Sequence, residues 1–303
     1  MIILPPLAIT TAMLTSTTAP EPAAGETAWA TGTFAIGALR IRSTTHRVYE
    51  CVQGHTGRAQ LPENDPLFWK DAGPTNAWAM FDVLRNTQTV LASPLTVRIT
   101  PGQRVDGIAM LGLVGDSATI SVSVAGTVVY SSTQSLQARQ PLGWYDYFFR
   151  PFVQQEAFVR FDLPPYTNAE ITVTLSKAVG SVKCGALVLG QQEYIGDVQY
   201  NAENDSTNYS KVERLFDGTA TFLPRRTVPK TSQTLFVSKA RVDRITKLRD
   251  EQLNGVPAVY CGLDGQVNDG YFNSLLILGF YRKFSINLAH PTDAVIQLDV
   301  EEI

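Results

Sequence analysis

The chain has 303 residues, of which 44% are hydrophobic and 17% are charged, and its formal net charge is −3 at pH 7. Soluble domains usually carry about 25% charged residues, so much of this surface must be neutral or covered by partners. The charge balance supplies no basic excess to neutralise phosphates, which argues against a nucleic-acid ligand. The length favours two or three compact units over one.

The N-terminal residues predict neither a signal peptide nor a membrane anchor. In MIILPPLAITTAMLTSTTAPEPAAG no Lys or Arg precedes the apolar run, and Pro5-Pro6 interrupts it, so we expect mature sequence. Nowhere does the chain reach the roughly 20 consecutive apolar residues of a spanning helix, which predicts no membrane insertion. Residues 1–24 are rich in Pro, Thr and Ala without a regular period. They predict an extended arm that lies against another surface. In an assembly, that surface is expected to belong to a neighbouring subunit.

Two β-rich units are predicted to follow this arm. Residues 25–73 are rich in aromatic residues, and glycines separate their β-rich runs, so we expect a small module of two or three strands. From residue 74 to residue 190 one strand-like run follows another, including PLTVRITP, ATISVSVAG, AEITVTLS and CGALVLG. Several alternate apolar and polar residues at period two, which predicts a β-sandwich without a helix.

Residues 191–303 predict a small α+β domain with one main helix. The helix is expected from Lys239 to Leu253, with Ser238 as its cap and Asn254-Gly255 as its end. Its apolar positions recur at helical spacing: Val242, Ile245, Leu248 and Leu253. The fold class is therefore predicted to be mainly β, with strands around a single helix.

The stretch HRVYECVQGHTG brings two histidines and a cysteine within ten residues, His46, Cys51 and His55. A zinc site or a cysteine nucleophile with a histidine base is one interpretation, but paired CxxC or HxxxH spacing is absent. A cysteine beside valine and tyrosine is more typical of packing in a strand, so we expect no metal, no cofactor and no catalytic residue here. The three cysteines are odd in number, which predicts buried, reduced thiols. The paired acids Glu301 and Glu302 are expected to be solvated.

Five aromatic residues lie within forty-one positions of the predicted module: Trp29, Phe34, Tyr49, Phe68 and Trp69. So small a unit cannot build a large core, and two interpretations stay open. The rings either form the core of the module, or some of them are exposed and stack on the apolar faces of sugars. On the second interpretation Trp29, Tyr49 and Trp69 are the carbohydrate-binding residues.

The order and spacing of these residues resemble the small chitin-binding modules appended to bacterial chitinases. The resemblance covers about forty-five residues and rests on Trp29, FAIG at 34–37, RVYEC at 47–51, GHT at 54–56 and PLFW at 66–69. Ala38 stands where that family usually has Asp. The resemblance implies sugar binding through Trp29, Tyr49 and Trp69.

Motifs across nearly the whole chain resemble tailed-bacteriophage minor tail or baseplate proteins. They are ILPPLAITTAMLTSTTAPE, GPTNAWAMFD, TPGQRVDGIAMLGL, WYDYFFRPF, LPPYTNAEITVTL, CGALVLGQQEYIG and ILGFYRKFSI. The resemblance implies a galactose-binding-like jelly roll in the middle of the chain and a place in a virion. Such particles assemble in the host cytoplasm, and the implied partners are other tail or baseplate subunits.

We therefore expect a non-enzymatic structural protein of a phage tail tip, present as a homo-oligomer, for which tail symmetry suggests a trimer. The second hypothesis is a receptor-binding adhesin that recognises bacterial surface glycan. A third is a glycan-degrading enzyme, which would need two carboxylates about 5 to 10 Å apart. Its candidate residues are Asp146, Glu156 and Asp162.

Overall fold

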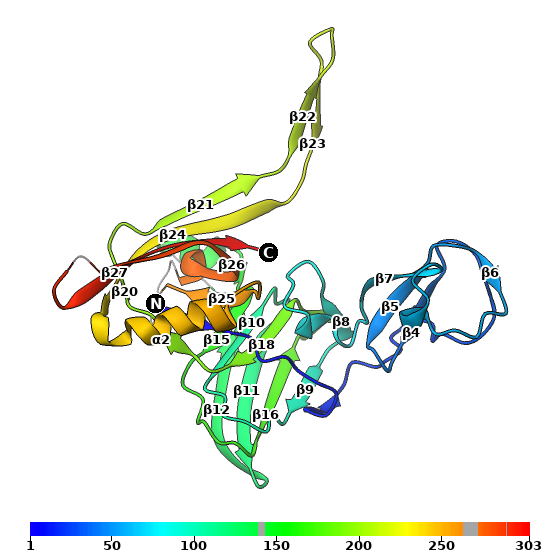
Figure 1. Ribbon diagram of the computed structural model, residues 1–303, viewed down its shortest axis with the longest axis horizontal. Helices are drawn as coiled ribbons and strands as arrows, with labels where there is room; N and C mark the ends of the chain where they lie inside the picture. The colour runs from blue at the N-terminus through cyan, green and yellow to red at the C-terminus, as the bar shows by residue number, and fades with distance from the viewer. Residues whose placement is uncertain (139–142, 263–271, 289) are drawn as a thin grey trace.

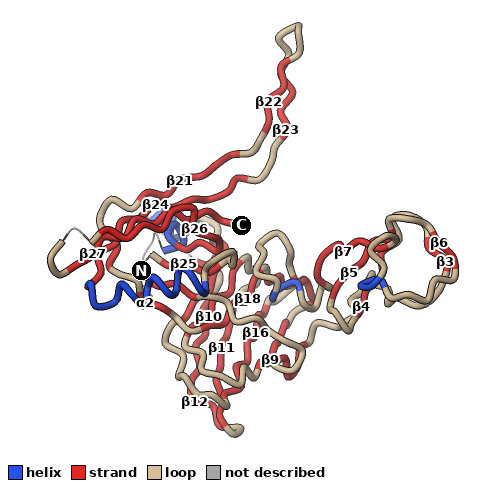
Figure 2. Tube along the Cα trace, viewed as in Figure 1, coloured by secondary structure: helices blue, strands red, loops and turns tan. Residues whose placement is uncertain are grey.

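The computed structural model describes residues 1–138, 143–262, 272–288 and 290–303 (Figure 1). Strands dominate all of its parts, and one main helical segment lies in the C-terminal third, as the tube in Figure 2 shows. The predicted mainly β class is therefore confirmed.

The aromatic module forms a lobe of its own at one end of the molecule (Figure 1). Two antiparallel sheets build it, so it contains more strands than expected. The smaller sheet pairs β3 (Thr33–Phe34) with β6 (His55–Thr56). The larger has the order β4-β5-β7, with β4 at Leu39–Arg42, β5 at Arg47–Cys51 and β7 at Trp69–Pro74.

Two antiparallel sheets form the predicted sandwich, one of order β12-β11-β16-β9-β2 and one of order β15-β10-β18. Side chains from both sheets meet in one core, which includes Ile120 of the first sheet and Leu189 of the second. The strands are β2 (Leu14–Thr17), β9 (Leu95–Ile99), β10 (Gly107–Leu111), β11 (Ser117–Val124), β12 (Thr127–Ser135), β15 (Ala157–Arg160), β16 (Ala169–Ser176) and β18 (Ala186–Gly190).

The three-stranded sheet of the sandwich, β15-β10-β18, is buried on both faces. Ile108 of β10 points into the sandwich core, whereas its neighbour Ala109 belongs to a second apolar cluster with Val259 and Leu278. Successive side chains of a strand alternate between the two faces of its sheet. A strand covered on both faces must therefore avoid polar side chains altogether, as the sequences GIAML of β10 and ALVLG of β18 do.

An eight-stranded antiparallel sheet covers the face of the β15-β10-β18 sheet that points away from the sandwich core. Its order is β19-β1-β25-β26-β27-β24-β20, with β21 paired to the outer part of β24. One face packs on the three-stranded sheet, and the opposite face carries the main helix. The strands are β1 (Ile2–Leu4), β19 (Glu193–Tyr194), β20 (Asp197–Val198), β21 (Glu203–Asn208), β24 (Thr227–Ser238), β25 (Ala258–Cys261), β26 (Leu276–Asn287) and β27 (Asp293–Glu302).

The main helical segment lies where the sequence predicts it. It consists of a 3-10 turn at Lys239–Arg241, α2 at Val242–Lys247 and a π-helical turn at Leu248–Gln252. Its apolar stripe is buried on the sheet through Ile245, Leu248 and Leu253, with Val242 partly buried beside them. Gly255 follows with a φ of 72°. Ser238 makes no capping hydrogen bond, so that part of the prediction is wrong: the segment starts as a 3-10 turn directly after β24.

Residues 1–24 belong to sheets of their own chain. β1 lies between β19 and β25, and β2 pairs with β9 at the edge of the sandwich. Two stretches of this segment thus pair with strands of the same chain, and its contact with a neighbouring subunit stays a prediction. The sequence concealed this because the strands that pair with β1 begin at Glu193 and Ala258.

A short helix, α1 (Trp144–Phe149), lies in the stretch predicted to hold no helix. It has no buried residue, so no apolar stripe announces it in the sequence. Three strand pairs complete the described fold: β8 (Thr89–Ala92) with β17 (Ser181–Cys184), β13 (Gln137–Ala138) with β14 (Val153–Gln154), and β22 (Lys211–Arg214) with β23 (Ala220–Leu223). Single 3-10 turns occur at Pro62–Asn64, Ala79–Phe81 and Phe272–Leu275.

The acids Glu301 and Glu302 are buried, which corrects the expectation that they are solvated. Arg282 Nε donates to Glu301 Oε2 at 2.6 Å, and Lys230 Nζ lies 3.7 Å from the same oxygen. Glu302 pairs with Arg85 from the sandwich and with Arg226. Removed from water, the two carboxylates need these cations as partners.

The N-terminal segment runs closely over the end of β18. Leu7 N–H donates to the carbonyl oxygen of Leu189 at 2.7 Å. A Cβ atom on Gly190 would lie 2.1 Å from the carbonyl oxygen of Pro5, so only glycine fits there.

Gly190→Ala should therefore displace the N-terminal segment and lower the free energy of unfolding by about 1–3 kcal/mol, the usual cost of overpacking. Chemical denaturation measures the change. Gly143→Ala is the matched control, because a Cβ there would meet nothing within 4 Å. Equal stability of the two variants would contradict the close approach.

The hydrogen bond from Arg282, assisted by the charges of Arg282 and Lys230, lowers the pKa of Glu301 below its ordinary value of 4.5. A lowered pKa in the folded state stabilises the fold above the ordinary value, and this contribution is lost as the pH falls through the lowered value. The denaturation midpoint should therefore drop below pH 4.5, and by less in Glu301→Gln. Glu251→Gln, at an exposed position, should keep the wild-type pH dependence.

Candidate functional site

The three rings expected to bind sugar occupy different depths of the module. Trp69 and Tyr49 are only 2% and 7% exposed and form the module core together with Phe34 and Cys51. Trp29 is half-buried and packs against this core. The rings of Phe34 and Trp69 meet edge to face, with centroids 5.1 Å apart. This geometry supports the core interpretation for Tyr49 and Trp69, since neither offers a ring face to a ligand, and leaves Trp29 as the ring that reaches the surface.

His46, Cys51 and His55 do not converge on one point. His55 lies among rings, 5.4 Å from those of Phe34 and Phe68. His46 instead joins the module to the rest of the chain: its ring stacks on Trp78 at 3.9 Å, and Nδ1 lies 2.7 Å from Glu21 Oε2. In the described part of the chain no group of three or more His, Cys, Asp or Glu side chains could hold a metal ion.

The cysteines are all buried and none forms a disulfide, as the sequence predicts. Burial raises the pKa of the Cys184 thiol to about 12, which keeps it protonated and unreactive. The carboxylates considered for glycan cleavage are each held by a different group. Asp146 pairs with Arg150, Glu156 with Arg85, and Asp162 accepts a hydrogen bond from the Tyr130 hydroxyl.

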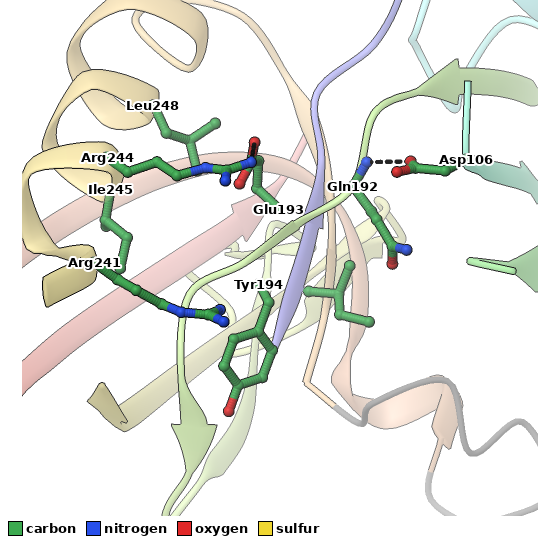
Figure 3. Close-up of a pocket in the computed structure, with 9 residues that line it drawn as sticks. Asp106, Gln192, Glu193, Tyr194, Arg241, Arg244, Ile245 and Leu248 are labelled. Atoms are coloured by element: carbon green, nitrogen blue, oxygen red, sulfur yellow. Dashed lines mark hydrogen bonds and ion pairs between the residues drawn. The ribbon is translucent and has the colours of Figure 1, made fainter. Parts of the chain in front are cut away.

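A cavity of about 380 Å³ lies between the main helix and β19 (Figure 3). Arg244 Nη2 donates to Glu193 Oε1 at 2.5 Å, and the Arg241 guanidinium lies 5.3 Å from the centre of the Tyr194 ring. Asp106 accepts a hydrogen bond of 2.7 Å from the backbone N–H of Gln192. The residues that line this cavity include neither a histidine nor a cysteine. Arg244 and Glu193 are thus paired with each other, and nothing in the lining points to catalysis.

A second kind of site is an exposed apolar surface, and α1 carries the densest one. We call residues 144–149 the aromatic segment. Trp144 is 82% exposed, and Tyr145, Phe148 and Phe149 are exposed to a similar degree. Asp146, the charged residue of the segment, pairs with Arg150 directly after it. Contiguous exposed rings of this kind mark interaction surfaces in soluble proteins.

The other exposed apolar surface is a projecting hairpin. β21 and β24 run beyond the body of the sheet and continue into the β22–β23 pair, which extends away from the rest of the molecule (Figure 1). We call residues 209–226 the hairpin arm. From Lys211 to Thr227 every residue is exposed, including Phe216 at the tip. A two-stranded hairpin is at best marginally stable alone in water, so contact with a further surface would stabilise the hairpin arm.

Neither surface was identified from the sequence as a site. The hairpin arm has a local signal: Asp217-Gly218 lies between the apolar runs VERLF and TATFL, and such a pair flanked by strands predicts a hairpin. Gly218 adopts a φ of 88° in this turn. The aromatic segment has no comparable signal, because its composition equally suits a buried core.

The helices of the described ranges include no candidate for a membrane-spanning segment. Comparisons with protein-family models, with curated proteins and with solved structures found no match to this chain.

Proposed function

We propose that the chain is a non-enzymatic structural subunit of a bacteriophage tail tip or baseplate. It occurs there as a homo-oligomer beside other tail subunits, in a virion assembled in the host cytoplasm. The observation that supports this best is the amount of apolar surface left open on the hairpin arm and the aromatic segment.

Energetics favour covering these surfaces. Burying one Phe-sized side chain is worth about 1.5–3 kcal/mol, so the four most exposed rings of the aromatic segment alone represent several kcal/mol. Neither surface contributes to the folded core, since α1 has no buried residue and the hairpin arm is exposed from Lys211 onward. Their stabilisation therefore comes from contacts with other chains, which is typical of a subunit in a large assembly.

Gold-labelled antibody against the chain, applied to particles of the phage that encodes it, tests the location directly. Label at the distal end of the tail is the expected result. Particles that lack the chain in mass spectrometry and in labelling would refute the proposal.

The double variant Phe148→Ser with Phe149→Ser tests whether the aromatic segment serves assembly. Both rings are exposed, so the free energy of unfolding of the free protein should change by no more than about 0.5 kcal/mol. Incorporation into particles, measured by quantitative mass spectrometry, should be lost. Normal incorporation of the variant would remove this segment from the assembly contacts.

A receptor-binding role is the second candidate, favoured by Trp29. This ring is half-buried at the module surface, the Arg42 guanidinium lies 5.7 Å from its centre, and its indole Nε1 has no hydrogen-bond partner. That nitrogen is buried, so the exposed part of the ring is what a ligand can reach, and it suits an apolar sugar face.

Trp29→Ala separates the two candidates. If the module holds glycan, the variant should lose retention on purified bacterial surface polysaccharide, and its free energy of unfolding should fall by less than that of a core-ring variant, since Trp29 is only partly buried. Trp69→Ala is the contrasting variant: it removes a core ring, so unfolding should become easier by about 3–5 kcal/mol. If the wild-type protein is not retained on the polysaccharide, the receptor-binding role is refuted and the structural role remains.

A further inference from the structure

The outer strand of the sandwich, β12, presents an open edge. It runs over nine residues, Thr127–Ser135, and among the described strands it pairs with β11 alone. Its sequence, TVVYSSTQS, contains no charged residue, and Val128 and Val129 are exposed. Long uncharged edges bind further strands readily, because their free N–H and C=O groups form a template.

Several other edges of the described sheets are protected. β21 carries Glu203 and Asp205, and β4 carries Arg40 and Arg42. The edge of β18 is covered where Leu7 donates to Leu189. At β8, the side chain of Asn76 binds both the N–H and the C=O of Val90. Against this background the long uncharged edge of β12 requires a partner strand.

The hairpin arm contains a strand that also has one unpaired edge. β23 (Ala220–Leu223) pairs with β22 on one side, and its sequence ATFL is also uncharged. Val212 and Phe222 face each other across the pair, on the face that also carries Ala220 and Arg214, and both apolar side chains are exposed. A hairpin gains stability when it becomes part of a larger sheet with a buried face.

The hairpin arm cannot reach β12 of its own chain. In Figure 1 it projects from the eight-stranded sheet at one end of the molecule, whereas β12 lies in the sandwich at the opposite end. The donor and acceptor strands must therefore belong to different molecules.

Charge favours a second copy of this chain as the acceptor. The hairpin arm contains four basic residues and two acidic ones, so it carries +2 and leaves −5 on the remainder of a chain whose net charge is −3. A positive arm is attracted to the negative body of another copy. Beside β12 itself the charges are balanced, since exposed Asp162 accepts from the hydroxyl of Tyr130 while Arg160 Nε donates to the hydroxyl of Ser132, so the attraction comes from the net charge of the body.

We propose that β23 of one copy adds to β12 of a second copy, extending its five-stranded sheet by strand addition. The contact joins two different surfaces, so it is head-to-tail and can repeat around a closed ring. This inference names the partner in the assembly role proposed above and rests on it.

Two half-defective variants test the contact. In the first, a short glycine linker replaces residues 210–225, which removes the donor strand. In the second, Ser131→Lys with Thr133→Lys places charges on the outward face of β12, where both side chains are exposed. Sedimentation velocity should give closed oligomers of the 33.2 kDa chain for the wild type and monomers for either variant alone. An equal mixture should give dimers, because each variant retains one half of the contact.

Matched controls keep the test decisive. Val179→Lys with Ser181→Lys adds the same charge to exposed positions elsewhere on the sandwich and should leave the wild-type oligomer intact. If the arm deletion fails to fold, Thr221→Lys with Phe222→Lys replaces it, since these substitutions charge β23 without shortening the chain.

Three results would overturn the proposal. Wild-type protein that stays monomeric would exclude a second copy as the partner. Dimers of the arm-deleted variant alone would indicate pairing of β12 with itself. A mixture that stays monomeric would show that the two surfaces do not meet. Particle labelling is independent of these outcomes. If the mixed variants form dimers but the chain is absent from phage particles, the tail location is refuted and the strand contact is still supported.

Discussion

The double burial of the three-stranded sheet is the constraint on which the rest of the architecture depends. β10 and β18 fill the sandwich core with one set of side chains and the contact with the C-terminal sheet with the alternate set. A polar residue at any central position of these strands would face an apolar layer, whichever way it pointed. The two larger sheets are thereby joined through a shared layer rather than through a flexible linker. The projecting parts of the molecule are consequently mounted on a rigid base.

The base also explains how the exposed surfaces are held. Glu302 is buried between Arg85 of the sandwich and Arg226 at the foot of the hairpin arm, so one carboxylate links the arm to the body. At the opposite end, His46 stacks on Trp78 and binds Glu21, which fixes the turn of the aromatic module against the sandwich. Both links lie where lobes meet, and polar groups there can be satisfied without interrupting either apolar core.

Local patterns in the sequence predicted what local chemistry determines. The period-two runs correspond to strands, and the spacing of Ile245 and Leu248 predicted the main helix, because these features depend on which neighbouring side chains are buried. Pairings over long distances were not accessible: nothing near Ile2 indicates that it pairs with Cys261, and nothing near Glu301 indicates Arg282. The candidate site follows the same division. The aromatic content of the module was clear, but whether Tyr49 and Trp69 lie inside or outside depends on how the two small sheets close around them.

The position of β1 has a consequence for how the polypeptide acquires its shape. A three-residue strand near the start of the chain lies between β19 and β25, so the central part of the eight-stranded sheet cannot form before residues 258–261 have left the ribosome. Pairings across such sequence separations form slowly, because the entropy of closing a long loop is lost before the contacts can stabilise it. The aromatic module contains its own short-range pairings and can fold during synthesis. Maturation should thus run from the module at one end toward the central sheet, with the first residues among the last to settle.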